Sequence, residues 1–119
     1  MIDIVDELVE DALRELADES RQRHLWLASN GDEISSFTEC VERLWTDSGL
    51  AHELERRNVV YTHAIDDDLR RLDALLNGID ASRADEEIID DPHLQRARLM
   101  ARKLLRDVRE FGLERDESR

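Results

Sequence analysis

The sequence predicts an all-α protein: a single-domain bundle of four main helices, with a short extra helical turn before the last. A chain of 119 residues is long enough for one hydrophobic core. It contains one Pro and four Gly among many Leu, Ala, Glu and Arg, a composition that favours helix over sheet. Apolar residues also recur every three or four positions. We assign residues 1–112 to the bundle and expect 113–119 to be a frayed tail.

The first predicted helix covers about residues 3–28. Asp6 and Glu7 fall in its first turn, where the helix dipole favours negative charge. Residues 28–35 contain Asn30-Gly31, which is typical of a loop. The apolar stripe of this helix comprises Ile4, Val5, Leu8, Val9, Ala12, Leu13, Leu16 and Ala17.

The second predicted helix begins with Ser36 and Glu39, which match a capping box. Gly49 follows it and is free to adopt a left-handed conformation that ends the helix. Its apolar stripe comprises Phe37, Cys40, Val41, Leu44 and Trp45.

The third predicted helix runs unbroken from about residue 50 to 77 and is closed by Gly78. Two polar residues, Asn58 and Asp68, interrupt its apolar stripe. A buried Asp needs a cation or hydrogen-bond donors. We expect that cation to come from the basic row of the last helix, which comprises Arg98, Arg102, Arg106 and Arg109.

The last predicted helix begins after Asp91 and ends at Gly112. An Asp cap followed by Pro92 is a strong start signal, because the first helical amide is unpaired in any case. Residues 84–89 before it form the short extra turn, with Ile88 and Ile89 directed toward the core.

The net charge of −13 constrains the partners. Residues 1–91 hold 25 acidic side chains against 9 Arg, whereas residues 92–119 hold 5 acidic side chains against 8 basic ones. Long-range repulsion then disfavours binding to nucleic acid or to an anionic membrane, and favours a basic protein partner. The N-terminal residues resemble no signal peptide, and the single Cys40 has no partner for an internal disulfide, so we expect a cytoplasmic protein.

One group of residues has the spacing of metal ligands. His63, Asp66 and Asp67 share a face of the third predicted helix. That face lies opposite the apolar stripe, and Arg70 and Arg71 follow the two aspartates at the spacing of ion pairs. We therefore interpret them as solvent-facing ion-paired residues, and expect no metal, cofactor or catalytic residue.

The acidic stretch before Pro92 supports two hypotheses. Once Asp91 serves as a cap, an exposed edge of carboxylates remains, comprising Asp85, Glu86, Glu87 and Asp90. The sequence of residues 86–90, EEIID, also resembles the acidic half of the Mg²⁺ site in all-α nucleotide pyrophosphohydrolases, which implies an enzyme. Such a site needs a second carboxylate pair, and the clear ExxD here, Glu15 with Asp18, precedes the motif instead of following it.

We predict a small acidic helical protein that binds and neutralises or regulates a basic protein partner. In size, helix count and charge it is similar to the acidic all-α immunity proteins of nuclease bacteriocins, although no residue is carried over. The alternatives are a Mg²⁺-dependent pyrophosphohydrolase-like enzyme and a structural accessory protein whose Val59/Val60 surface makes a homodimer; those valines would otherwise pack under the 28–35 loop. The predicted partner-binding residues are Asp66, Asp67, Asp85, Glu86, Glu87, Asp90, Val59 and Val60.

Overall fold

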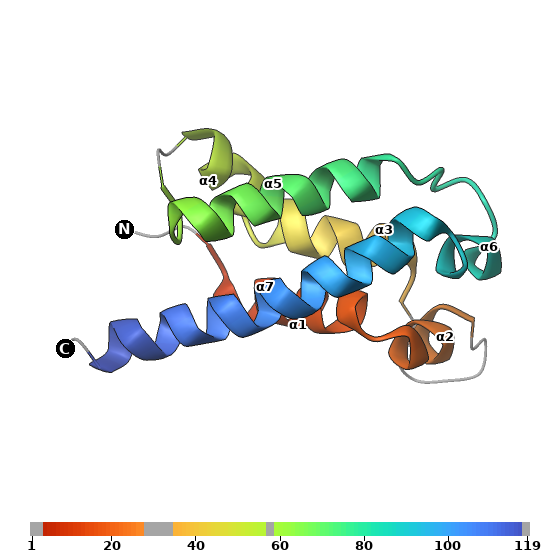
Figure 1. Cartoon of the computed structure of the whole chain (residues 1–119). Coiled ribbons are helices and arrows are strands. Elements are labelled where there is room, and N and C mark those ends of the chain that lie inside the picture. The colour runs from red at the N-terminus through yellow and green to blue at the C-terminus, as the bar shows by residue number, and fades with distance from the viewer. Residues whose placement is uncertain (1–3, 28–34, 57–58, 118–119) are drawn as a thin grey trace.

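The computed structural model describes residues 4–27, 35–56 and 59–117, and all the regular structure within these ranges is helical (Figure 1). The prediction of an all-α fold is therefore confirmed. The elements are α1 (Asp6–Ala17), α2 (Glu19–Leu27), α3 (Phe37–Glu42), a π-helix η1 (Arg43–Asp47), α4 (Leu50–Arg56), α5 (His63–Asn77), α6 (Asp85–Ile89) and α7 (Pro92–Glu117).

Helix α7 is the element around which the others are arranged. It packs against α1 on one side and α5 on the other, and crosses in front of α1 in Figure 1. Ala97 and Ala101 on its buried face have fully covered side chains, and their small size lets neighbouring backbones approach closely. Near its C-terminal end Phe111 meets Tyr61 edge-on, with ring centroids 5.3 Å apart.

The first predicted helix is divided in two, so the expectation of a continuous helix over residues 3–28 is wrong. Asp18 has an extended backbone (φ −125°, ψ 104°) between α1 and α2. Its carboxylate accepts a hydrogen bond from the Arg21 backbone amide at 3.1 Å. An Asp side chain that bonds to nearby amides competes with the helical ladder, and here it starts a new helix.

The third predicted helix is also divided, into α4 and α5. Thr62 has an extended backbone, and its hydroxyl accepts from the Ile65 amide at 3.0 Å, which makes Thr62 the N-cap of α5. Val59, Val60 and Thr62 are β-branched and lose side-chain freedom in a helix, so the interruption falls where helix propensity is low. Asn58, expected on the apolar stripe, lies outside the described residues.

The predicted limits of the second helix are confirmed. Ser36 accepts a hydrogen bond from the Glu39 amide at 3.1 Å, and Gly49 has the positive φ of 83° that a left-handed cap requires. What the periodicity did not predict is the change from α3 to the π-helix η1, in which Leu44 and Trp45 are buried. Short π-helical segments of this kind often occur at functional sites.

The beginning of the last helix is confirmed and its predicted end is wrong. Asp91 accepts from the His93 amide at 2.7 Å, and Pro92 is the first helical residue. The helix then continues past Gly112 to Glu117, so residues 113–117 are helical and not a frayed tail. A Gly inside a helix costs only about 1 kcal/mol relative to Ala, which does not outweigh the ladder on either side. The short helix α6 is where the extra turn was predicted.

Candidate functional site

The acidic residues predicted to bind a partner fall in two separate regions. Asp67 lies near the beginning of α5, whereas α6 lies beyond its far end, next to α2 (Figure 1). These two regions occupy opposite ends of the elongated molecule, whose longest extent is 44 Å. They therefore do not form one continuous acidic patch.

The region around α6 is an acidic edge on a firmly anchored helix. Ile88 and Ile89 are buried, as predicted. Glu87 pairs with Arg83 at 3.1 Å, and Asp90 pairs with Arg23 of α2 at 3.1 Å. The two other predicted edge residues are the exposed Glu86 and the half-buried Asp85.

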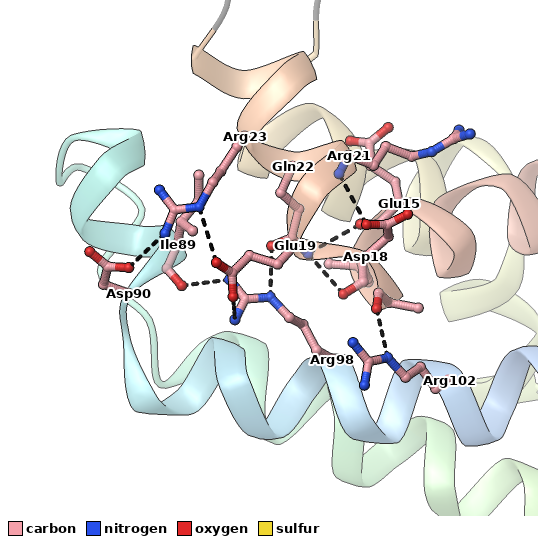
Figure 2. Close-up of polar contacts among 12 residues, drawn as sticks. Glu15, Asp18, Glu19, Arg21, Gln22, Arg23, Ile89, Asp90, Arg98 and Arg102 are labelled. Carbon is pink, nitrogen blue, oxygen red and sulfur yellow. Dashed lines mark hydrogen bonds and ion pairs between the residues drawn. The ribbon is translucent and has the colours of Figure 1, made fainter.

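Arg98 of α7 anchors this edge from below (Figure 2). Its side chain is only 5% exposed. The guanidinium donates from Nε to Gln22 Oε1 at 2.9 Å and from Nη2 to the backbone carbonyl of Ile89, and it lies 3.3 Å from Glu19. Burial lowers the pKa of Arg98, although an arginine stays charged at neutral pH. One cation thus joins α2, α6 and α7.

The same cluster satisfies the end of α1. The Gln22 side-chain amide donates to the carbonyls of Glu15 (3.1 Å) and Leu16 (2.8 Å). Arg102 donates from Nε to the Ala17 carbonyl at 2.9 Å (Figure 2). The last carbonyls of a helix have no partner within it, so these donors explain why α1 can end inside the protein.

Asp66 is buried, although it was predicted to face solvent. It is 1% exposed, and its carboxylate accepts from the backbone amides of Val60 (2.7 Å) and Tyr61 (3.1 Å). The expectation that it faces solvent and pairs with Arg70 is therefore wrong. The physical reason is the break before α5, which leaves amides that a carboxylate in the first turn can reach.

Asp67 and the two valines remain at the surface to different degrees. Asp67 is exposed and lies 3.5 Å from Arg70, three residues along the helix, instead of pairing with Arg71. Val59 and Val60 are half-buried, and Val60 packs against the hydrophobic core. His63 is exposed while Asp66 is buried, and backbone amides take up the Asp66 carboxylate, so the three residues do not converge as the metal-ligand spacing suggested.

Asp68 is buried, as its position on the apolar stripe predicted, but its cation differs from the expected one. Lys103 of α7 binds its carboxylate, and Arg71 lies 2.8 Å away. Hydrogen bonding from Lys103 and then from Arg71 holds the pKa of Asp68 below its ordinary value. The predicted basic row points elsewhere: Arg109, for example, lies 3.9 Å from Glu10 of α1.

Sequence reasoning missed a buried carboxylate with several side-chain donors, Glu15. It is 4% exposed and accepts from Trp26 Nε1 at 2.9 Å, from Ser35 Oγ at 2.8 Å and from Arg43 at 3.1 Å. Burial would raise the pKa of Glu15, but these hydrogen bonds outweigh it and the pKa is lowered. No local signal reveals this cluster, because its members come from four separate segments.

The arrangement around Glu15 also bears on the Mg²⁺ hypothesis. Glu15 is directed into the core, and Asp18 is the cap of α2, so this pair does not supply the second half of a site for Glu86, Glu87 and Asp90. Within the described ranges no three His, Cys, Asp or Glu side chains are grouped as metal ligands would be.

Comparisons with protein-family models, with curated protein sequences and with solved structures found no match. Among the described helices, none is long and apolar enough to cross a membrane.

Proposed function

We propose that this protein binds a basic protein partner and neutralises or regulates it, as inhibitors of the immunity type do. The observation that carries the proposal is the acidic edge of α6. Its carboxylates are set at the surface on a helix whose isoleucines are buried and whose last residue is bound by Arg98. A rigidly held charged edge loses little conformational freedom when it binds.

The net charge also supports the proposal. Two of the arginines, Arg98 and Arg43, bind carboxylates and carbonyls of this chain. Because the net charge is −13, the surface keeps a large excess of carboxylates. Such an excess speeds association with a positively charged protein and repels nucleic acid and anionic membranes.

The test starts from capture of partners on the immobilised full chain, in lysate of the cells to which it is native. Each captured protein is identified by mass spectrometry and then purified for kinetic measurements. We expect a basic protein whose association rate constant falls roughly tenfold or more between about 0.02 and about 0.2 M salt. A rate constant that does not change with salt contradicts the proposal.

Neutral variants show whether the acidic edge is used. The combined change Asp85→Asn, Glu86→Gln and Glu87→Gln should slow association at low salt by roughly tenfold. The matched control neutralises three carboxylates that are exposed elsewhere on the surface: Glu39→Gln, Asp47→Asn and Glu110→Gln. Equal slowing by the two triple variants would mean that net charge alone, and not the α6 edge, attracts the partner.

A further inference from the structure

A seam runs between α5 and the segment formed by α3 and η1. The two sides make few backbone contacts, and α5 packs mainly on α7. Two hollows lie along the seam. The first, of about 240 Å³, lies between η1, α4 and α5, and the second, of about 300 Å³, lies between α3 and the end of α5.

The floor of the seam is apolar. Trp45, Leu54 and Leu69 line the first hollow, and Phe37, Val41 and Leu76 line the second. Leu69, Asp73 and Leu76 of α5 line the two hollows from one side, and Phe37, Val41 and Trp45 line them from the other. Both hollows therefore lie between α5 and residues 37–45.

The indole N–H of Trp45, beside the first hollow, is a hydrogen-bond donor without an acceptor. Its side chain lines the first hollow and is 8% exposed. Its Nε1 is buried, and within the described part of the chain nothing accepts a hydrogen bond from it. The other tryptophan behaves in the usual way, since Trp26 Nε1 donates to Glu15. A buried indole N–H without an acceptor is rare and calls for an explanation.

The rim of the seam is acidic. Glu55 and Asp73 border the first hollow and Glu42 borders the second, and none of the three forms an ion pair with another described side chain. The cation at the rim, Arg70, is already held by Asp67 at 3.5 Å and by the Leu54 carbonyl at 3.3 Å. An occupant that carries positive charge fits this rim, and an acidic one does not.

We propose that the seam is the docking groove for an extended segment of the basic partner in which apolar residues alternate with Lys or Arg. The proposal rests on the proposed function in taking the partner to be basic. Alternate side chains of an extended segment point in opposite directions, so apolar ones can fill the hollows while cationic ones reach Glu42, Glu55 and Asp73. Trp45 Nε1 is covered in the free protein, so a free backbone carbonyl of such a segment accepts from it once the indole turns toward the first hollow.

An extended segment fits better than a helix because of the indole donor. The carbonyls in a helix interior are already bonded within the helix, whereas those of an extended segment are free. The second hollow extends to the connection before α6, where Ile79 and Ala81 line it.

Nuclear magnetic resonance of the ¹⁵N-labelled full chain tests the proposal through its two tryptophans. The probe is a short capped peptide of alternating Leu and Lys, used while monomeric, and its control is the peptide with Glu in place of Lys. We expect the Leu–Lys peptide to move the indole N–H signal of Trp45 downfield. The signal of Trp26, already bonded to Glu15, should stay in place. An unmoved Trp45 signal, or equal shifts with the Leu–Glu peptide, would overturn the proposal.

A pair of charge reversals locates the binding. Asp73→Lys, at the rim of the first hollow, should weaken binding of the Leu–Lys peptide by roughly tenfold or more. Glu110→Lys makes the same change of charge at an exposed position of α7 and should leave the affinity within about twofold. Equal weakening by both variants would contradict a groove in the seam.

Measurements on the captured partner distinguish a failure of the docking groove from a failure of the proposed function. If a basic partner binds with the expected salt dependence and Asp73→Lys leaves its affinity unchanged, the proposed function stands and the groove is overturned. If the Leu–Lys peptide moves the Trp45 signal while every captured protein is neutral or acidic, the groove is supported and the proposed function fails.

Discussion

At the scale of single residues, Glu15 joins segments that are distant in the sequence. It brings together Trp26 of α2, Ser35 before α3 and Arg43 of η1. A buried charge without partners would be strongly unfavourable, whereas one with several donors is stabilised. The same contacts that lower its pKa therefore link the stability of the protein to pH.

We predict that Glu15→Gln destabilises the protein by about 1–3 kcal/mol at pH 7, because Arg43 loses a buried carboxylate and Trp26 and Ser35 lose a charged acceptor. A group with a lowered pKa contributes stability above its unfolded pKa, about 4.3 for Glu. That contribution is lost as the pH falls through the folded value. Urea unfolding at several pH values measures both effects.

In the Gln variant the free energy of unfolding should fall less steeply on acidification below about pH 5 than in the wild type. Glu39→Gln is the control, because Glu39 is exposed and surface changes of this kind usually stay within about 0.5 kcal/mol. Parallel pH profiles for Glu15→Gln and the wild type would contradict the assignment of the pH dependence to Glu15.

At the scale of elements, the interruptions are determined by where backbone groups find partners. Gln22 and Arg102 donate hydrogen bonds to the last carbonyls of α1. Asp66 accepts hydrogen bonds from the backbone amides that precede α5. These side chains offset the cost of ending or beginning a helix in the interior. By contrast Gly112 of α7 is exposed, and an added Cβ would meet nothing within 4 Å.

We therefore predict that Gly112→Ala stabilises the protein by about 0.5–1 kcal/mol, since Ala favours a helix interior and restricts the unfolded chain. The comparison is Gly49→Ala, which should destabilise by about 1 kcal/mol or more because Gly49 has φ 83°. Chemical denaturation of both variants measures the two changes in the free energy of unfolding, which should have opposite signs. A Gly112→Ala variant less stable than the wild type would mean that α7 does not continue through this position.

At the scale of the whole molecule, the charge opposes compactness. A net charge of −13 is held within a radius of gyration of 14.4 Å, so the carboxylates repel one another across the surface. Several exposed ion pairs offset this repulsion only slightly, because each contributes little in water. The cations Arg98, Lys103 and Arg43 meet carboxylates of other elements and hold the helices together.

We predict that salt stabilises the protein. Raising the salt concentration from about 0.02 to about 0.2 M should increase the free energy of unfolding by roughly 1 kcal/mol, because the repulsion is screened more than the short ion pairs. Thermal unfolding followed by circular dichroism measures the change as a higher midpoint. A midpoint that falls as salt is added would show that the ion pairs outweigh the repulsion.

Much of this protein follows from the sequence alone. The helical class, the capping residues Ser36 and Asp91, the left-handed Gly49 and the burial of Asp68, Ile88 and Ile89 were all predicted. Each depends on residues within a few positions of one another, or on the helical period. Such local interactions are the same in any fold, which is why the sequence by itself determines them.

The tertiary structure decided what depends on distant segments. The break at Asp18 depends on Gln22 and Arg102, which donate hydrogen bonds to the last carbonyls of α1. The burial of Glu15 depends on Arg43, which lies beside its carboxylate. Lys103, and not an arginine of α7, meets Asp68 because the packing of α7 on α5 sets the register. Periodicity determines which residues share a face, but only the packing of that face against another element determines which atoms meet.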